Sequence, residues 1–167
     1  MAFRQPGRTL GVDPGSRITG IGVLEKNENR IRHLYSGSIR LGALPSLTLR
    51  LEMIHRRLEE IIRDFQPTEM ALEKVFVSKN VHSALILGHV RGVALLAAVQ
   101  GSLELFEYSP LEIKKAVTGY GRADKGQVQS MVRALLGLET AKSQDVSDAL
   151  AVAICHLNWF RTASPAA

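Results

Sequence analysis

The sequence predicts an α/β fold in which a mixed β-sheet carries helices on its faces. The N-terminal part contains short runs rich in Ile and Val, separated by turn-forming residues, as is typical of antiparallel strands. Farther along, apolar residues recur at three- and four-residue spacing, and helical and strand-like segments then alternate. Hairpin strands followed by helix, strand, helix and strand indicate a sheet with an antiparallel edge and crossover helices.

Three consecutive segments are expected to form the antiparallel part of the sheet. Arg8 to Asp13 is a strand-like run that ends at a Pro-Gly turn. Ile18 to Glu25 follows as its hairpin partner, and Ile31 to Leu41 supplies a third strand. Asn27 to Asn29 form the turn between the second and third strands.

The next two segments change the hydrophobic period. An amphipathic helix is predicted from the spacing of Leu47, Leu51, Ile54, Leu58, Ile61 and Phe65, and it ends before Pro67. Met70 to Val75 is strand-like and uniformly apolar until Glu73, as expected of a strand covered on both faces.

The segment from Ser83 to Val99 is predicted to be a helix that is apolar nearly all round. One interpretation is that one side packs on its own sheet while another side needs a second cover. Gly88 and Gly92, four residues apart, would let a second backbone approach closely. The alternative is a deeply buried central helix, and the sequence alone does not separate the two.

The C-terminal third is predicted to add one strand and three helices. Leu103 to Tyr108 is the strand, and the helices span about 111–117, 125–136 and 145–160, with a glycine-containing loop at 118–122. No repeat or linker marks a boundary, so residues 1–167 are expected to form one domain, with a flexible leader at about 1–7 and a flexible tail at about 162–167.

Composition narrows the functional classes. The chain is 46% hydrophobic and 22% charged, an ordinary globular balance, and its formal charge of +5 favours a polyanionic partner. No uncharged run reaches the ~18 residues of a membrane span, and the N-terminus has no apolar signal core. The single Cys155 suits a reducing compartment, so a cytoplasmic protein without a membrane partner is expected.

Four carboxylates are the candidate catalytic residues. Asp13 ends the first strand, Glu73 lies near the end of the fourth, and Asp145 and Asp148 begin the last helix. Each has a structural alternative: Asp13 as a turn starter, Asp145 as a helix cap with Asp148 in the first turn, and Glu73 emerging at the sheet edge. Glu73 is the hardest to explain structurally, because a lone carboxylate in an apolar strand is expensive to bury.

Considered together, the four acids predict a metal-dependent hydrolase. If the first and fourth strands are parallel neighbours, Asp13 and Glu73 meet at their carboxyl ends, and Asp145 and Asp148 share a helix face. Four carboxylates in one cleft repel one another unless protons or divalent cations relieve them, and hard oxygen ligands select Mg²⁺ or Mn²⁺. Two such ions about 4 Å apart would serve phosphodiester hydrolysis.

Five segments resemble the RuvC family of Holliday-junction resolvases: VDPGSRITGIGV, ALEKVFVSKN, SALILGHVRGVALLAAV, GYGRADKGQVQSMV and SQDVSDALAVAICH. The resemblance runs from about Arg8 to His156 and implies an RNase H-like fold with a five-stranded mixed sheet and helices on both faces. It also implies that the metal-binding catalytic acids are Asp13, Glu73, Asp145 and Asp148. Some relatives carry His in place of the third acid, so Asp145 implies an all-carboxylate site.

The resemblance further implies a crossover junction endodeoxyribonuclease of recombination and repair. Its substrate would be the four-way DNA junction, nicked symmetrically on two opposing strands to leave 5′-phosphate ends, with two Mg²⁺ ions per active site and Mn²⁺ able to substitute. Two matched incisions need two active sites, so a homodimer is expected, with the Ser83 to Val99 helix in its interface. RuvA and RuvB, the branch-migration proteins, are the implied partners.

DNA-binding residues are also implied by the resemblance. Phe76 matches an aromatic residue that stacks on opened bases, although an ordinary core Phe is the structural alternative. Lys114 and Lys125 match lysines near the scissile phosphate, where cations would stabilise charge. Further phosphate contacts are expected from basic residues whose alternative role is solvated surface charge: Lys79, Arg91, Lys115 and Arg122.

Three other functions compete with junction cleavage. The Asp13-Pro14-Gly15-Ser16 turn also fits the first phosphate loop of actin-like ATPases, but the chain lacks their second domain and second glycine-rich loop. A non-catalytic junction-binding protein would have lost an acid, and all four are present. A nuclease of the same fold acting on another nucleic acid, such as an RNA:DNA hybrid, is the main alternative.

Overall fold

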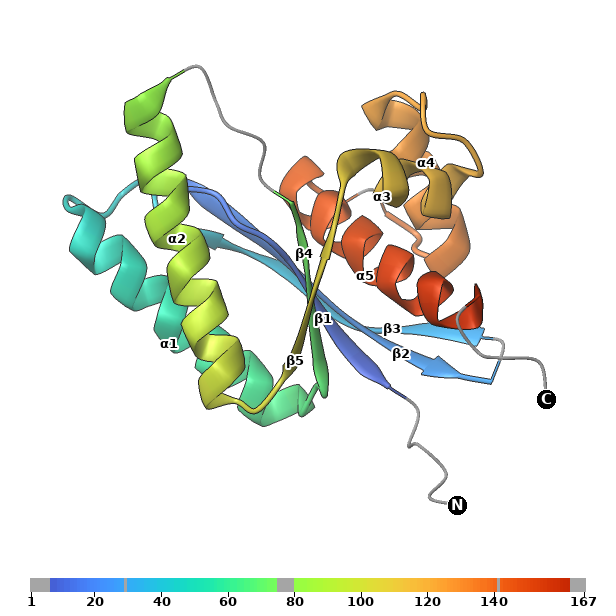
Figure 1. The fold of residues 1–167 in the computed structure, drawn as a ribbon, viewed down its shortest axis with the longest axis horizontal. Helices are drawn as coiled ribbons and strands as arrows, with labels where there is room; N and C mark the ends of the chain where they lie inside the picture. Colours follow the sequence, from blue (N-terminus) through green and yellow to red (C-terminus); the bar gives the residue numbers. More distant parts are fainter. Residues whose placement is uncertain (1–6, 29, 75–79, 141, 163–167) are drawn as a thin grey trace.

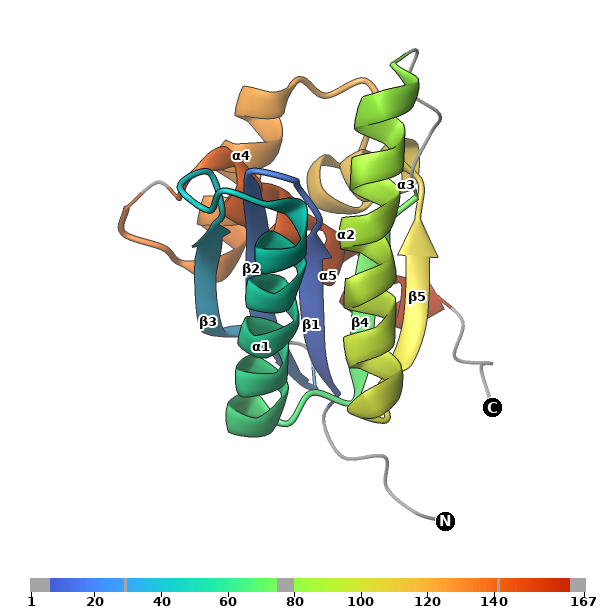
Figure 2. The ribbon, with the colours of Figure 1, turned by 90° about the vertical axis from the view of Figure 1, so that its left-hand side faces the viewer.

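The computed structural model describes residues 7–28, 30–74, 80–140 and 142–162, and the side chains of these residues as far as Asn158. A twisted sheet forms the middle layer of the molecule (Figure 1). Helices α1 and α2 cover one face of the sheet, and α3, α4 and α5 cover the other (Figures 1 and 2). The predicted α/β architecture with helices on both faces is confirmed.

The sheet contains five strands in the order β3-β2-β1-β4-β5. Strands β1, β2 and β3 are antiparallel, whereas β4 and β5 run parallel to β1, so the predicted mixed sheet with an antiparallel edge is confirmed. The strands are β1 (Arg8–Asp13), β2 (Ile18–Asn27), β3 (Arg30–Arg40), β4 (Glu69–Glu73) and β5 (Glu104–Tyr108).

The fourth strand is shorter than expected at its carboxyl end. It ends at Glu73, and the next residue, Lys74, donates its backbone N–H to the carbonyl of Tyr108 at 2.7 Å. Val75, the expected last residue, lies outside the described ranges. Glu73 is therefore the terminal residue of a strand rather than a residue within one.

Each predicted helix is present, and capping residues explain where four of them begin. The helices are α1 (Leu47–Phe65), α2 (Val81–Gln100), α3 (Pro110–Thr118), α4 (Lys125–Leu136) and α5 (Gln144–Thr162). Side chains of Ser46, Asn80, Ser109 and Asp124 accept hydrogen bonds from backbone N–H groups of the first turns of α1 to α4. α2 starts two residues before the expected Ser83, because Asn80 caps it by accepting from the Ser83 N–H at 3.1 Å.

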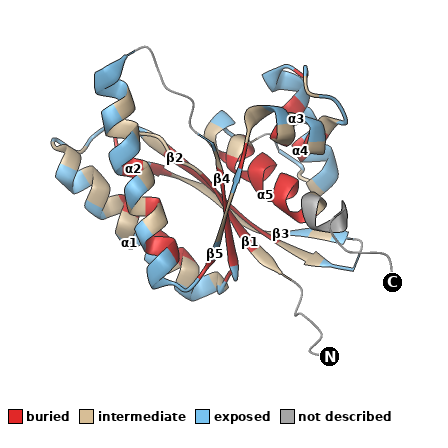
Figure 3. Ribbon diagram, viewed as in Figure 1, coloured by how far each residue is buried: buried red, intermediate tan, exposed pale blue. Residues whose placement is uncertain are grey.

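Two hydrophobic cores lie on opposite faces of the sheet. Along β1, Leu10 and Val12 point into the core under α1 and α2, whereas Gly11 faces α5. α5 is buried along almost its whole described length (Figure 3), because the sheet lies on one side of it and α3 and α4 lie on another. The face under α5 therefore carries the odd-numbered residues of β1.

Glycines on this face allow α5 to lie almost directly on the strand backbones. A Cβ placed on Gly20 would come within 1.9 Å of the Asp145 carbonyl oxygen, and one on Gly11 within 2.1 Å of the Ala149 carbonyl oxygen. No larger residue fits either position unless the helix moves. The first two turns of α5 are thus held against β1 and β2 by the absence of side chains beneath them.

Toward its carboxyl end, α5 is joined to three strands by a buried polar network. His156 is fully buried, with Nε2 at 2.9 Å from Glu69 Oε2 and Nδ1 at 2.7 Å from the Tyr108 hydroxyl. Thr9 donates a 3.3 Å hydrogen bond to the same Glu69 oxygen, which connects β1, β4 and β5 to the helix. His156 therefore lies in the interior, and both of its ring nitrogens have partners.

Helix α2 leaves much of its apolar surface uncovered. Only Val90, Ala94, Ala97 and Ala98 are buried, whereas Leu85 is 60% and Val99 70% exposed. Deep burial, one of the two interpretations of this segment, is therefore wrong for the single chain. Within the described residues α2 is also the one helix that could cross a membrane by length and composition. The sequence has no uncharged run of that length in this helix, because Arg91 interrupts the segment.

We predict that Gly20→Ala destabilises the protein, whereas Gly42→Ala has little effect. The new methyl group would clash with the Asp145 carbonyl, and overpacking of this kind costs about 1–3 kcal/mol. At Gly42 no described atom lies within 4 Å of an added Cβ, so it is the matched control. Thermal unfolding followed by circular dichroism should show a loss of about 2–4 °C per kcal/mol for Gly20→Ala. Equal melting temperatures for the two variants would contradict the close approach.

Candidate active site

Two of the four candidate acids lie side by side at one end of the sheet. Asp13 is the last residue of β1 and Glu73 the last of β4, and these strands are parallel neighbours with Val12 opposite Leu72. Because side chains alternate along a strand, Asp13 shares the face of Gly11, and Glu73 shares the face of Ala71. Both belong to the face that packs against α5.

Helix α5 brings the other two acids to the same place. It begins at Gln144, so Asp145 stands within the first turn rather than at the cap, and Asp148 lies one turn farther on. Gly20 is the register partner of Asp13, and the Asp145 carbonyl sits directly over Gly20. The glycine contact therefore places the start of α5 beside the end of β1, as the hypothesis of a carboxylate cluster requires.

Burial and mutual repulsion act on the pKa values of this cluster. The pKa of Asp13 rises to about 7, first because the side chain is desolvated, and then because Asp148, Glu73 and Asp145 carry like charges nearby. The cation of Lys125 opposes this rise. Asp13 is therefore partly protonated near neutral pH.

Glu73 and Asp148 show the same influences in weaker form. Burial raises the pKa of both, and Asp148 raises that of Glu73 further. Lys125 lowers the pKa of both, and Lys114 lowers that of Glu73. A hydrogen bond with the Gln144 side chain also lowers the pKa of Asp148. These couplings place Lys114 and Lys125 within electrostatic reach of the acids. Their role near a phosphate stays a prediction.

The donor chemistry of the cluster fits hard divalent cations. All four acids supply oxygen, and the repulsion that raises the Asp13 pKa is relieved when a cation binds between the carboxylates. Among the described residues, no three His, Cys, Asp or Glu side chains are grouped tightly enough to enclose one ion. The arrangement therefore couples the acids electrostatically without forming a closed metal cage.

Other residues expected at the site have different outcomes. Phe76 and Lys79 lie outside the described ranges. Arg122 and Lys115 are exposed, and no described contact joins either of them to the acids. Arg91, expected as a phosphate contact, is instead engaged within the fold. It donates a 2.8 Å hydrogen bond to the Glu73 carbonyl and forms an ion pair with Glu107.

Arg91 is thus a support for the site that the sequence pattern did not assign. Its guanidinium reaches from α2 to the end of β4 and holds the backbone of Glu73 there. The sequence held one signal for this role, because Arg91 is a single charge in an otherwise apolar helix and such a residue usually pairs within the fold.

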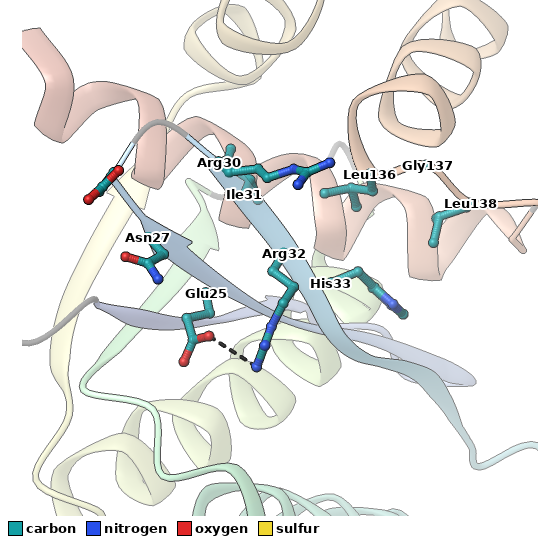
Figure 4. Close-up of a pocket in the computed structure, with 10 residues that line it drawn as sticks. Glu25, Asn27, Arg30, Ile31, Arg32, His33, Leu136, Gly137 and Leu138 are labelled. Carbon is teal, nitrogen blue, oxygen red and sulfur yellow. Dashed lines mark ion pairs between the residues drawn. The ribbon is translucent and has the colours of Figure 1, made fainter.

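A pocket of about 720 Å³ lies away from the acids. It is formed by the β2–β3 hairpin and the end of α4 (Figure 4), and its lining includes the ion pair between Arg32 and Glu25, 3.2 Å apart. None of the four acids lines it. The hairpin end of β2 is the opposite end of the sheet from Asp13, because β2 runs antiparallel to β1.

Comparison with known proteins shows the family. A family model described as crossover junction endodeoxyribonuclease RuvC matches residues 9–156. The RuvC of Syntrophotalea carbinolica is 53% identical over 153 residues, covering 92% of this chain and 95% of that protein. The RuvC of Magnetococcus marinus is 48% identical over 170 residues, covering 100% and 94% respectively.

Solved structures give the same result. The structure described as T. thermophilus RuvC in complex with Holliday junction substrate superimposes with a TM-score of 0.87 at 31% identity, covering 93% of this chain and 96% of that one. The yeast mitochondrial Holliday junction resolvase Ydc2, at 14% identity and a TM-score of 0.67, shares the fold.

We predict that Asp13→Asn stabilises the metal-free protein at pH 8 but not at pH 4. With a pKa near 3.8 in the unfolded chain and about 7 in the folded one, Asp13 favours unfolding increasingly as pH rises between these values. Asn removes that penalty, of order 1–3 kcal/mol after solvent screening, or roughly 2–10 °C in Tm.

Thermal melts with a chelator at both pH values test this prediction. Asp64→Asn is the matched control, because Asp64 is an exposed aspartate on α1, away from the cluster. If the difference in Tm between Asp13→Asn and wild type is the same at both pH values, the raised pKa of Asp13 is contradicted.

Proposed function

The chain belongs to the RuvC family of crossover junction endodeoxyribonucleases, and we propose that its four-acid cluster cleaves the strands of Holliday junctions in recombination and repair. The observation that carries this proposal is the convergence of Asp13, Glu73, Asp145 and Asp148 at one end of the sheet, with the pKa of Asp13 raised to about 7. We also propose that residues 1–167 form one nuclease domain and that this domain acts in the cytoplasm.

Membership of this nuclease family implies dependence on divalent metal, and we propose Mg²⁺, two ions per site, with Mn²⁺ able to substitute. Asp13, Glu73, Asp145 and Asp148 would hold the ions, which supply Lewis acidity and a water of lowered pKa. The chain itself contributes orientation, because two neighbouring strands, β1 and β4, and the helix α5 carry the carboxylates.

The neighbouring cations serve the substrate rather than the metal. Lys114 and Lys125 already lie close enough to the acids to lower their pKa values, so a phosphate bound at the acids would lie near both ammonium groups. There they attract the DNA backbone and stabilise charge that develops on the phosphate oxygens. Arg122 as a further phosphate contact and Phe76 as a base-stacking residue complete the proposed DNA interface.

A homodimer would supply the two sites needed for symmetric nicks with 5′-phosphate ends. A groove of about 510 Å³ lies between α1 and α2, lined by Leu51, Ala84, Leu85, Gly88, His89, Gly92, Val93 and Leu96. No described atom lies within 4 Å of a Cβ added to Gly88 or Gly92, so this stretch of helix is open to close approach. A second copy of α2 fits such a surface by two-fold symmetry. RuvA and RuvB remain proposed partners in branch migration.

Cleavage of matched substrates tests the activity. Wild-type protein with Mg²⁺ is incubated with equal amounts of labelled four-way junction, linear duplex and RNA:DNA hybrid. We expect paired symmetric nicks confined to the junction, and a loss of at least about 100-fold for Asp148→Asn. Asp64→Asn, with the same chemical change on α1, should cleave like wild type. Preferential cleavage of the hybrid would favour the alternative nuclease function instead.

The dimer has its own test. We predict that Leu85→Glu combined with Leu96→Glu converts a dimer to monomers in sedimentation at micromolar concentration, since each charge would be buried against the partner. Leu135→Glu, at a 46% exposed position on α4, is the control and should stay dimeric. A monomeric wild type, or a double variant that remains dimeric, would contradict this interface.

A further inference from the structure

Two arginines at the acid end of the sheet have side chains that pair with no other group in the described part of the chain. Arg17 lies in the loop between β1 and β2, and Arg40 is the last residue of β3. Both are exposed, and within the described residues neither guanidinium makes a hydrogen bond or an ion pair. Other arginines are engaged; Arg8, for example, binds Glu25 and the carbonyl of Phe65.

Strand register places Arg40 on the same face as the acids. Asp13 pairs with Gly20, and Gly20 pairs with Ser38, so these three residues form a row across the sheet that faces α5. Ile18 pairs with Arg40 two residues farther along, with no irregularity in between. Because side chains alternate with a period of two, Arg40 points to the face of Asp13. Its neighbours Ile39 and Leu41 confirm this, since both are buried in the core on the opposite face.

The strand register also sets the distance between Asp13 and Arg40. Asp13 and Arg40 are separated by two strand spacings across the sheet and about two residues along it, so their Cα atoms lie about 12 Å apart. A guanidinium at this distance does not neutralise Asp13, and Arg40 is absent from the groups that shift its pKa. The charge of Arg40 is close to the cluster but remains available to a substrate.

Arg17 is held at the same corner by its backbone. The Leu41 N–H donates a 2.8 Å hydrogen bond to the Arg17 carbonyl, which fastens the loop to the residue after Arg40. Thr19 closes the loop from inside, donating to the Gly15 carbonyl at 3.0 Å and accepting from the Gly15 N–H at 3.3 Å. The end of β3 and the β1–β2 loop lie at the same end of the sheet (Figure 2), and the hydrogen bond from Leu41 brings the backbones of the two arginines together at one corner.

Positive charge thus lies on two sides of the acids. Lys114 on α3 acts on Glu73 of β4, and the corner formed by β3 and the β1–β2 loop lies on the other side of β1, because the strand order is β3-β2-β1-β4-β5. A chain of phosphates passing over the acids would run from one cationic group to the other. Such contacts set the position of a strand without reading its sequence.

We propose that Arg17 and Arg40 bind backbone phosphates of the DNA strand that flanks the cleaved bond, on the side opposite Lys114. This inference rests on the proposed nuclease function and assigns two further substrate-binding residues to it. Arginine suits the task because its planar guanidinium binds phosphate oxygens in a bidentate manner.

Arg30 provides a matched control on the same strand. It begins β3, is exposed, and makes no hydrogen bond or ion pair within the described residues. It lies ten residues from Arg40, or roughly 33 Å along the strand, beside the hairpin pocket and far from the acids (Figure 4). Arg30→Gln removes one positive charge, as each single substitution of the proposed pair does, without touching the proposed contact.

The experiment measures junction binding without metal, so that no strand is cut, across a series of salt concentrations. For Arg17→Gln with Arg40→Gln we expect about 10-fold weaker binding and a salt dependence that is smaller by roughly one to two released counterions. With Mg²⁺, KM should rise more than kcat falls, because both contacts bind substrate away from the cleaved bond. The charge-preserving Arg17→Lys with Arg40→Lys should retain the salt dependence, and Arg30→Gln should match wild type throughout.

If the double Gln variant and Arg30→Gln bind the junction with equal affinity and equal salt dependence, the inference about Arg17 and Arg40 is overturned. The proposed function stays intact in that case as long as the wild type cleaves the junction. A wild type that neither binds nor cuts the junction would overturn both. Unfolding temperatures of all variants should agree, since neither side chain supports the fold.

Discussion

The contact between α5 and the glycine-bearing face of the sheet is the constraint on which the site depends. Two acids come from strand ends and two from a helix, and only an unusually small separation between these layers brings them together. Gly11 and Gly20 leave room for helix carbonyls where a methyl group would already clash. Packing and chemistry are therefore set by the same positions, and a change that separates the layers separates the carboxylates as well.

The two ends of α5 differ in their electrostatics. Toward the carboxyl end, His156 hydrogen-bonds with Glu69 and Tyr108, so that buried polar groups have partners. At the amino end, like charges are held close together, and burial together with their repulsion raises the pKa of Asp13. A well-satisfied network, together with the buried apolar contacts of the helix, holds α5 in place while its first turn carries charges that repel those of the strands. Functional sites often depend on such support from a rigid neighbouring region.

The surface around the acids is organised by which cations are already engaged. Arg8 and Arg91 make contacts within the fold, and Arg91 holds the backbone of Glu73. Lys114 and Lys125 act on the acids at longer range. A formal charge of +5 on the whole chain therefore says little by itself about binding, because some of the cations are paired with groups of the protein itself. The cations near the acids that are not paired in this way are the ones available to bind a substrate.

The sequence by itself determined the elements and the mixed sheet, because hydrophobic period and turn residues are local signals. It also pointed to four candidate acids, of which Glu73 is conspicuous as a carboxylate in an apolar strand. Strand and helix ends were less well determined, since caps such as Asn80 act through single hydrogen bonds. Only the tertiary structure decided that Gly20 lies beneath Asp145, that Arg91 supports Glu73, and that Arg40 shares the face of Asp13. These relations depend on strand register and on distances between layers, which join residues far apart in the chain and leave no periodic trace in the sequence.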